Sequence, residues 1–138
     1  MKEIYVIDAC ALIAYFNDED GADKVAYLFK KASRKEVEVL MPAINLCEVY
    51  YDCLRIKGEK KAKELLEKIE LLPVFIQKTL ENDLLMLAGK FKVEESVSLA
   101  DSFALGLAKL KEAKLVTSDH HEFDTIEEKG LLEFEWIR

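Results

Sequence analysis

Apolar and polar residues follow one another along this chain in short runs that predict strands and helices in turn. Residues 4–7 (IYVI) form an apolar run of strand length, and residues 9–16 (ACALIAYF) form an apolar run of helix length. The two predicted elements meet at Asp8, the only charged residue between them. Open α/β sheets usually carry their chemistry at the carboxyl ends of strands, which makes Asp8 the first candidate functional residue.

The same alternation of patterns continues to the end of the chain. Helical spacing of apolar residues, with capping and breaking residues at the ends, predicts helices over residues 22–34, 42–58, 59–72, 79–91 and 98–112. Apolar runs predict strands over residues 37–41, 74–76, 115–117 and 131–137, the last with the alternation of an edge strand. Thr79 and Ser98 are the expected caps of the last two helices. These elements predict an α/β fold, a three-layer α/β/α sandwich with a mainly parallel central sheet, as one domain over residues 1–138.

Composition narrows the class of protein. With 138 residues, 51% hydrophobic and 34% charged, the chain resembles an ordinary globular domain. A formal charge of −7 argues against indiscriminate binding of polyanions, although a basic patch or bound metal ions still allow a nucleic-acid enzyme. Cys10, Cys47 and Cys53 have no CxxC spacing and indicate a reducing compartment. Because no run is long enough to span a bilayer, we expect a cytoplasmic protein without a membrane partner.

Two acidic residues in the first half of the chain have both a structural and a functional interpretation. An aspartate directly before a helix, such as Asp8, is a favoured N-cap. Glu48 is the only charged residue of the segment AINLCEVYY. It is also spaced three and four residues from Asn45 and Asp52, so all three fit the solvated stripe of an amphipathic helix. Both interpretations stay open for each residue.

A third acid, Asp101, lies in a helix that is apolar or small on nearly every side, SLADSFALGLAKL. Such a helix is expected to be largely buried, and a buried carboxylate without a partner usually has a cation nearby. The structural alternative is that Ser98 and Asp101 form an S-x-x-D capping pair. Both interpretations are compatible with each other.

The last acidic group follows the predicted strand 115–117. Asp119 lies at the carboxyl end of that strand, and Asp124 follows five residues later. Thr117 and Ser118 are placed to orient carboxylates or to hydrogen-bond metal-bound water. The alternative is ordinary turn chemistry, for which Ser and Asp are common. In an extended loop the adjacent histidines that follow would point apart, so no joint zinc site is expected.

Taken together, the acids indicate a metal site. Carboxylates without His or Cys ligands suit hard cations such as Mg²⁺ or Mn²⁺, which activate water and stabilise phosphoryl displacement. Basic residues are also concentrated in one short stretch of the chain, which forms either a solvated helix face or a phosphate-binding patch beside the site. The acids are Asp8, Glu48, Asp101 and Asp119, and the basic residues are Arg55, Lys57, Lys60, Lys61 and Lys63.

Three blocks of the chain resemble the PIN domain family, and together they cover essentially its whole length. They are IDACALIAYF near the start, Glu48 within an apolar helix, and SLADSFALGLAKLKEAKLVTSDHHEF near the end. The last block is the most specific, because the helix aspartate, the strand and the T-x-D element occur in the family's order. Size and layout are similar to the single-domain toxin ribonucleases of VapC-type toxin–antitoxin pairs.

The resemblance implies a hydrolase, a metal-dependent endoribonuclease that cleaves RNA phosphodiester bonds. It implies that Asp8, Glu48, Asp101 and Asp119 are catalytic and hold one or two Mg²⁺ or Mn²⁺ ions. By the same resemblance Thr117 supports the site, the protein is a homodimer, and a small antitoxin protein is a possible partner.

Two departures from the family pattern concern the site. PIN domains usually carry Ser, Thr or Asn two residues after the first aspartate, and this chain carries Cys10. The TSDHHEF loop has one more residue before Phe123 than many relatives, so Asp124 is an alternative or additional ligand beside Asp119.

Other protein classes fit less well. A haloacid-dehalogenase phosphatase needs a second aspartate where Cys10 stands, and a response-regulator receiver needs an acidic neighbour for Asp8 and a mid-chain aspartate after residue 76. The remaining alternative is a PIN fold kept as a non-catalytic binding module. The complete set of acids argues against that alternative.

Overall fold

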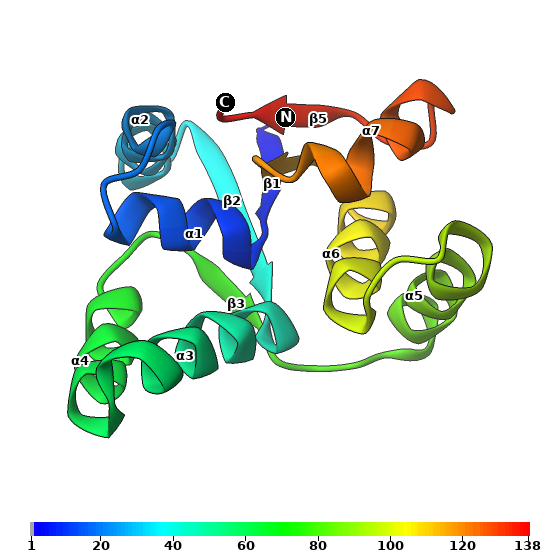
Figure 1. Ribbon diagram of the computed structural model, residues 1–138. Coiled ribbons are helices and arrows are strands. Elements are labelled where there is room, and N and C mark those ends of the chain that lie inside the picture. Colours follow the sequence, from blue (N-terminus) through cyan, green and yellow to red (C-terminus); the bar gives the residue numbers. More distant parts are fainter. Residues whose placement is uncertain (1) are drawn as a thin grey trace.

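Strands and helices alternate along residues 2–138, the part of the chain that the computed structural model describes (Figure 1). The strands are β1 (Glu3–Ile7), β2 (Val37–Pro42), β3 (Phe75–Gln77), β4 (Lys114–Thr117) and β5 (Phe134–Trp136). The helices are α1 (Ala9–Phe16), α2 (Ala22–Ser33), α3 (Ala43–Lys57), α4 (Glu59–Glu70), α5 (Asn82–Glu95), α6 (Leu99–Leu110) and α7 (His120–Glu128). Within residues 2–138, no helix combines the length and the apolar character needed to cross a membrane.

The strands form one five-stranded sheet in the order β3-β2-β1-β4-β5, and every neighbouring pair is parallel. β1 lies at the centre, where Val6 pairs with Leu40 of β2 and Ile7 pairs with Val116 of β4. β5 lies at an edge, as its alternating pattern predicted. The predicted α/β fold with a parallel sheet is confirmed.

Two hydrophobic cores lie on opposite faces of the sheet. Successive side chains of a strand point to opposite faces. Tyr5 and Ile7 accordingly belong to the core under α1–α4, whereas Val6 belongs to the core under α5–α7. Figure 1 shows these two groups of helices on either side of the sheet. Because β1 is buried from both sides, the backbone that leads into Asp8 is held rigidly.

Two local predictions were wrong. The helix expected to start after Thr79 begins at Asn82, and the Thr79 hydroxyl instead accepts a hydrogen bond from Gln77 Nε2 at 2.8 Å. The stretch after Asp119, expected to be a loop, is helix α7. Phe123 and Ile126, three residues apart, bury this helix against the sheet, and two apolar positions are too few for a clear periodic pattern.

The strand order creates a crevice beside β1. The chain runs from β1 to β2 on one side, and it returns from β3 to β4 on the other side of β1, so the helices that follow β1 and β4 lie on opposite faces of the sheet. Open parallel sheets bind ligands outside the carboxyl ends of the strands at such a switch point. Asp8 follows β1 and Asp119 follows β4, which places both at this crevice.

Helices α5 and α6 cross very closely at Gly106. A β-carbon at this position would lie 3.0 Å from the Ala88 backbone nitrogen and 3.2 Å from its α-carbon. These atoms belong to the α5 backbone, which yields less readily than the end of a flexible side chain. By contrast, a β-carbon at Gly89 of α5 would meet nothing within 4 Å.

We predict opposite effects for two glycine-to-alanine substitutions in this helix pair. Gly106→Ala should lower the free energy of unfolding by about 1–2 kcal/mol, because the methyl group forces α5 and α6 apart. Gly89→Ala should raise the free energy of unfolding by up to about 1 kcal/mol through helix propensity. Urea denaturation of both variants measures the difference. Equal stability of the two variants would contradict the close crossing.

Candidate active site

A pocket at the carboxyl edge of the sheet brings together residues that are far apart in the sequence. It is formed by the end of β1, one face of α3 and the first turns of α1, α6 and α7. Its lining residues are Asp8, Ala9, Cys10, Ile13, Glu48, Tyr51, Asp52, Arg55, Ser98, Asp101, Asp119 and Glu122. The structure therefore brings all four predicted carboxylates to one place.

Asp8 is the most enclosed of these carboxylates, with 3% of the residue exposed. Its backbone N–H donates to the Val116 carbonyl at 3.2 Å, which extends the β1–β4 pairing by one residue. Its Oδ1 accepts a hydrogen bond from the Ala11 N–H at 2.9 Å, so Asp8 caps α1. The capping interpretation is correct, and it coexists with a position in the pocket.

The environment of Asp8 disfavours its negative charge. Burial raises the pKa of the Asp8 carboxyl to about 7, although hydrogen bonds from the Thr117 hydroxyl and the Ala11 N–H act in the opposite direction. The charges of Asp101 and Asp119 raise it further. Asp8 therefore gains from any cation that enters the pocket.

Asp101 lies in the first turn of α6. Its backbone N–H donates to Ser98 Oγ at 3.1 Å, which confirms the predicted capping pair. Burial raises the pKa of the Asp101 carboxyl to about 6, the Ser98 hydroxyl opposes this shift, and the charges of Glu48 and Asp119 add to it. Asp101 thus takes part in the helix cap through its backbone N–H, while its carboxylate is a repelled member of the acidic pocket.

Glu48 reaches the pocket from α3, and its neighbour Asn45 is fully buried rather than solvated. Asn45 Nδ2 donates to the Ala100 carbonyl at 3.3 Å, which joins α3 to α6 beside Asp101. Burial raises the pKa of the Glu48 carboxyl, and hydrogen bonding to Asn45 counteracts this. The solvated-stripe interpretation is therefore wrong for Asn45, because no local signal in the sequence reveals that α6 covers it.

Asp119 lines the pocket after β4, and Thr117 and Ser118 lie directly before it, outside the lining. Asp119 Oδ1 accepts from the Glu122 N–H at 3.2 Å and so caps α7, as Asp8 caps α1. The fully buried Thr117 accepts from the Asp119 N–H at 3.0 Å through its hydroxyl oxygen. Ser118 Oγ lies 3.0 Å from Cys10 Sγ, so the cysteine that departs from the family pattern keeps a polar contact.

Asp124 lies outside the pocket. It is one turn along α7, where its Oδ1 lies 2.7 Å from His120 Nδ1. His120 Nε2 lies 2.8 Å from the Arg138 carbonyl oxygen, and the ring stacks on Trp136 at 3.8 Å between centroids. This pair of residues fastens the C-terminal strand rather than facing the acids.

The donor chemistry of the pocket fits a hard divalent cation. Its acids are carboxylates, and within residues 2–138 Asp8, Glu48, Asp101 and Asp119 have no ion-pair partner. In their present positions, no three His, Cys, Asp or Glu side chains of the described residues are close enough together to coordinate one metal ion. Mutual repulsion keeps like charges apart, and a divalent cation favours their ionised forms.

Comparison with solved structures identifies the fold. The chain is similar to DNA-bound VapBC from Salmonella typhimurium, with 17% identity, a TM-score of 0.72 and full coverage of both chains. It is similar to VapBC2 from Rickettsia felis bound to a promoter DNA fragment, with 19% identity, a TM-score of 0.71, and 96% and 98% of the two chains covered. It is also similar to Mycobacterium tuberculosis VapC20, a sarcin-ricin loop cleaving toxin, with 17% identity, a TM-score of 0.61, and 82% and 86% coverage.

Comparison with curated protein sequences gives no match. The family model described as PIN domain, however, matches residues 5–129. This range contains every residue that lines the acidic pocket. The chain therefore belongs to the PIN domain family, as its motifs predicted.

Proposed function

We propose that this protein is a metal-dependent endoribonuclease that hydrolyses RNA phosphodiester bonds as the toxin of a type II toxin–antitoxin pair. The observation that carries the proposal is the convergence of Asp8, Glu48, Asp101 and Asp119 on one pocket at the switch point of the sheet. Membership of the PIN domain family supports it. The similarity to a toxin that cleaves the sarcin-ricin loop agrees with an RNA substrate.

In this proposal Asp8, Glu48, Asp101 and Asp119 hold one or two Mg²⁺ or Mn²⁺ ions. Such ions supply an activated water and stabilise the charge that develops on the phosphate oxygens. Asp119 is preferred to Asp124 as the fourth ligand because it lines the pocket, whereas Asp124 faces His120.

The chain's own residues position these carboxylates. The buried Thr117 hydroxyl accepts a hydrogen bond from the Asp119 N–H, and the same hydroxyl acts to lower the pKa of the Asp8 carboxyl, so one side chain influences the acids at both strand ends. Asn45 holds the Glu48 helix against the Asp101 helix. One of the four carboxylates also orients the attacking water or accepts its proton, which requires an ionised acid close to the phosphate.

The alternative function is a PIN-fold binding module without catalysis. Decay of a catalytic site commonly removes one or more carboxylates, and here all four line the pocket. Cleavage and metal binding separate the two functions directly, because a pure binding module shows neither.

A cleavage assay tests the catalytic proposal. With Mg²⁺ or Mn²⁺ and an RNA substrate, Asp8→Asn and Asp101→Asn should each lower the cleavage rate by at least about 100-fold. Substituting residues that only orient metal ligands already costs about 10–100-fold. The control Asp124→Asn should keep cleavage within about 2-fold of wild type. Equal cleavage by wild type and both pocket variants would exclude the mechanism.

The raised pKa values of Asp8 and Asp101 predict how the stability of the metal-free protein varies with pH. A carboxyl whose pKa is higher in the folded than in the unfolded state stabilises the fold only while it is protonated. Stability should therefore fall as pH rises from about 4 to about 7, by at most about 4 kcal/mol for Asp8. Denaturation of wild type and Asp8→Asn across this range measures the change; the substitution should remove the contribution of Asp8 and leave the smaller contribution of Asp101, whose pKa is about 6.

The same titration predicts the effect of metal. Protons compete with cations for the carboxylates, so Mg²⁺ or Mn²⁺ should raise the melting temperature more at pH 8 than at pH 5. Thermal denaturation with and without each ion measures this. If neither ion stabilises the protein at pH 8, the proposed metal site is wrong.

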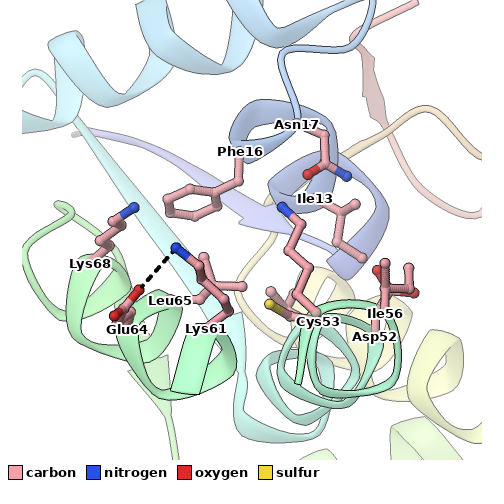
Figure 2. Close-up of a pocket in the computed structure, with 12 residues that line it drawn as sticks. Ile13, Phe16, Asn17, Asp52, Cys53, Ile56, Lys61, Glu64, Leu65 and Lys68 are labelled. Carbon is pink, nitrogen blue, oxygen red and sulfur yellow. Dashed lines mark ion pairs between the residues drawn. The ribbon is translucent and has the colours of Figure 1, made fainter. Parts of the chain in front are cut away.

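A groove beside the acidic pocket supports the proposed antitoxin partner. It lies between α1, α3 and α4, and Figure 2 shows Ile13 and Phe16 of α1 pointing toward the other two helices. Lys57, Lys61 and Lys68 also line it. We propose that a small antitoxin inserts an apolar segment flanked by acidic residues here. Solved relatives titled as VapBC complexes support a protein partner.

Charge insertion tests this groove. Ile56, which lines it and is 67% exposed, tolerates Ile56→Glu without disturbing the core. Ile56→Glu should weaken binding of the small protein encoded by the adjacent gene by at least about 10-fold, because the new carboxylate is desolvated against the apolar segment and repels its acidic flanks. The matched control is Leu80→Glu, which is exposed and outside the groove. Titration calorimetry measures both, and equal affinities would contradict the site.

We also propose that the protein is a homodimer in the cytoplasm. Leu85, Met86 and Val93 expose apolar side chains along α5, and burial of such a surface favours association. The lack of a CxxC pair among Cys10, Cys47 and Cys53 supports a reducing compartment.

A further inference from the structure

One face of α3 forms a complete wall of the acidic pocket. Glu48, Tyr51, Asp52 and Arg55 follow helical spacing of three, four and seven residues from the first to the others, so they share one face. All four line the pocket. Only Glu48 belongs to the proposed metal ligands, which leaves three polar side chains at the rim without an assigned function.

Arg55 is the only cationic side chain among the described residues that line this pocket. Its Nη2 donates to Asp52 Oδ1 at 2.6 Å, while 70% of the Arg55 side chain stays exposed. A guanidinium carries five N–H donors, so one contact to Asp52 fixes its direction and leaves others free. This arrangement suits a two-point hydrogen bond to a phosphate.

Tyr51 stands one turn before Arg55 and exposes 51% of its surface. It lines the same pocket as Glu48, three residues away on the same face of α3, so it lies close to the proposed ligands. An exposed ring beside a catalytic pocket offers a flat apolar face on which a nucleobase stacks without sequence preference.

The structure assigns a nucleotide-binding subsite to Tyr51 and Arg55, in which Arg55 binds a phosphate of the RNA strand and Tyr51 stacks on an adjacent base. This inference rests on the proposed RNA cleavage. It places the strand along α3, with the scissile phosphate at the carboxylates and a neighbouring nucleotide at the rim.

The contacts of the other basic residues single out Arg55. Lys61 and Lys57 line the neighbouring groove, and Lys63 lies 3.8 Å from its partner Glu59. Of the predicted basic concentration, Arg55 is the member that reaches the acidic pocket. Among the basic residues predicted to bind phosphate, Arg55 alone is therefore retained as a phosphate-binding residue at the pocket, with Tyr51 as its aromatic neighbour.

Binding of a short fluorescent single-stranded RNA tests the subsite. The Asp8→Asn protein serves as the parent, because it suppresses turnover, and fluorescence anisotropy measures the dissociation constant. Arg55→Ala and Tyr51→Ala should each weaken binding about 5- to 50-fold, whereas Tyr51→Phe should bind like the parent. Arg55→Ala should also reduce the slope of log affinity against log salt by about one, and Tyr51→Ala should leave it unchanged.

Controls separate direct contact from a change of charge. Loss of Arg55 leaves Asp52 unpaired, so a double variant, Asp52→Asn with Arg55→Ala, restores the net charge and should still bind weakly. Recovery of full affinity in this double variant would overturn the phosphate contact. Arg34→Ala and Tyr27→Ala remove the same residue types from exposed positions outside the pocket, and both should bind like the parent.

Cleavage kinetics distinguish failure of this inference from failure of the proposed function. In the otherwise wild-type enzyme, Arg55→Ala and Tyr51→Ala should raise KM about 5- to 50-fold and change kcat less than about 3-fold, because neither residue touches the reacting atoms. If wild type cleaves RNA while both variants match it in KM and in binding, the subsite is wrong and the nuclease stands. If wild type neither cleaves nor binds RNA, both proposals fail.

Discussion

The buried carboxylate of Asp8 is the constraint on which the site depends. It follows the central strand, between two neighbours that are themselves parallel strands, and the like charges of Asp101 and Asp119 act on it. A buried charge with charged neighbours of the same sign is expensive unless it is hydrogen-bonded. Backbone N–H groups at helix starts supply those bonds, from Ala11 to Asp8 and from Glu122 to Asp119. Helices α1 and α7 thus begin at positions where their first backbone N–H groups can donate hydrogen bonds to the carboxylates of Asp8 and Asp119.

These bonds hold the acids in place but do not neutralise them. The pKa of Asp8 is about 7 and that of Asp101 about 6 despite the capping contacts, because burial outweighs them. The two cores on either side of β1 prevent the strand from moving Asp8 toward solvent, since Val6 and Ile7 are fully buried on opposite faces. Proton binding or cation binding then relieves the repulsion. The fold therefore couples its packing to the charge state of the pocket.

The sequence predicted the sheet and the helix cap at Asp8 well because those signals are local. The apolar runs on either side of Asp8 define β1 and α1, and the cap follows from their junction. Features that depend on distant segments could not be predicted. Asn45 occupies a polar position of α3 and becomes buried only because α6 packs over it and accepts its hydrogen bond at Ala100. Helix α7 was hidden for a similar reason, since its burial rests on Phe123 and Ile126 alone.

The face of α3 is compatible with both interpretations of its polar pattern, as a solvated stripe and as part of a site. The polar stripe with Glu48 and Asp52 is exposed to solvent, as such a pattern suggests. The solvent-exposed space that it faces is the acidic pocket. The acidic pocket adjoins the lysine-lined groove. Asp52 of the stripe lines both cavities, as does Ile13 of α1. A protein segment bound in the groove would lie against Asp52, the residue that orients Arg55. Under the proposed function, an antitoxin segment in this groove would block the RNA strand at the rim without reaching the carboxylates, so its inhibition would not require competition with the metal.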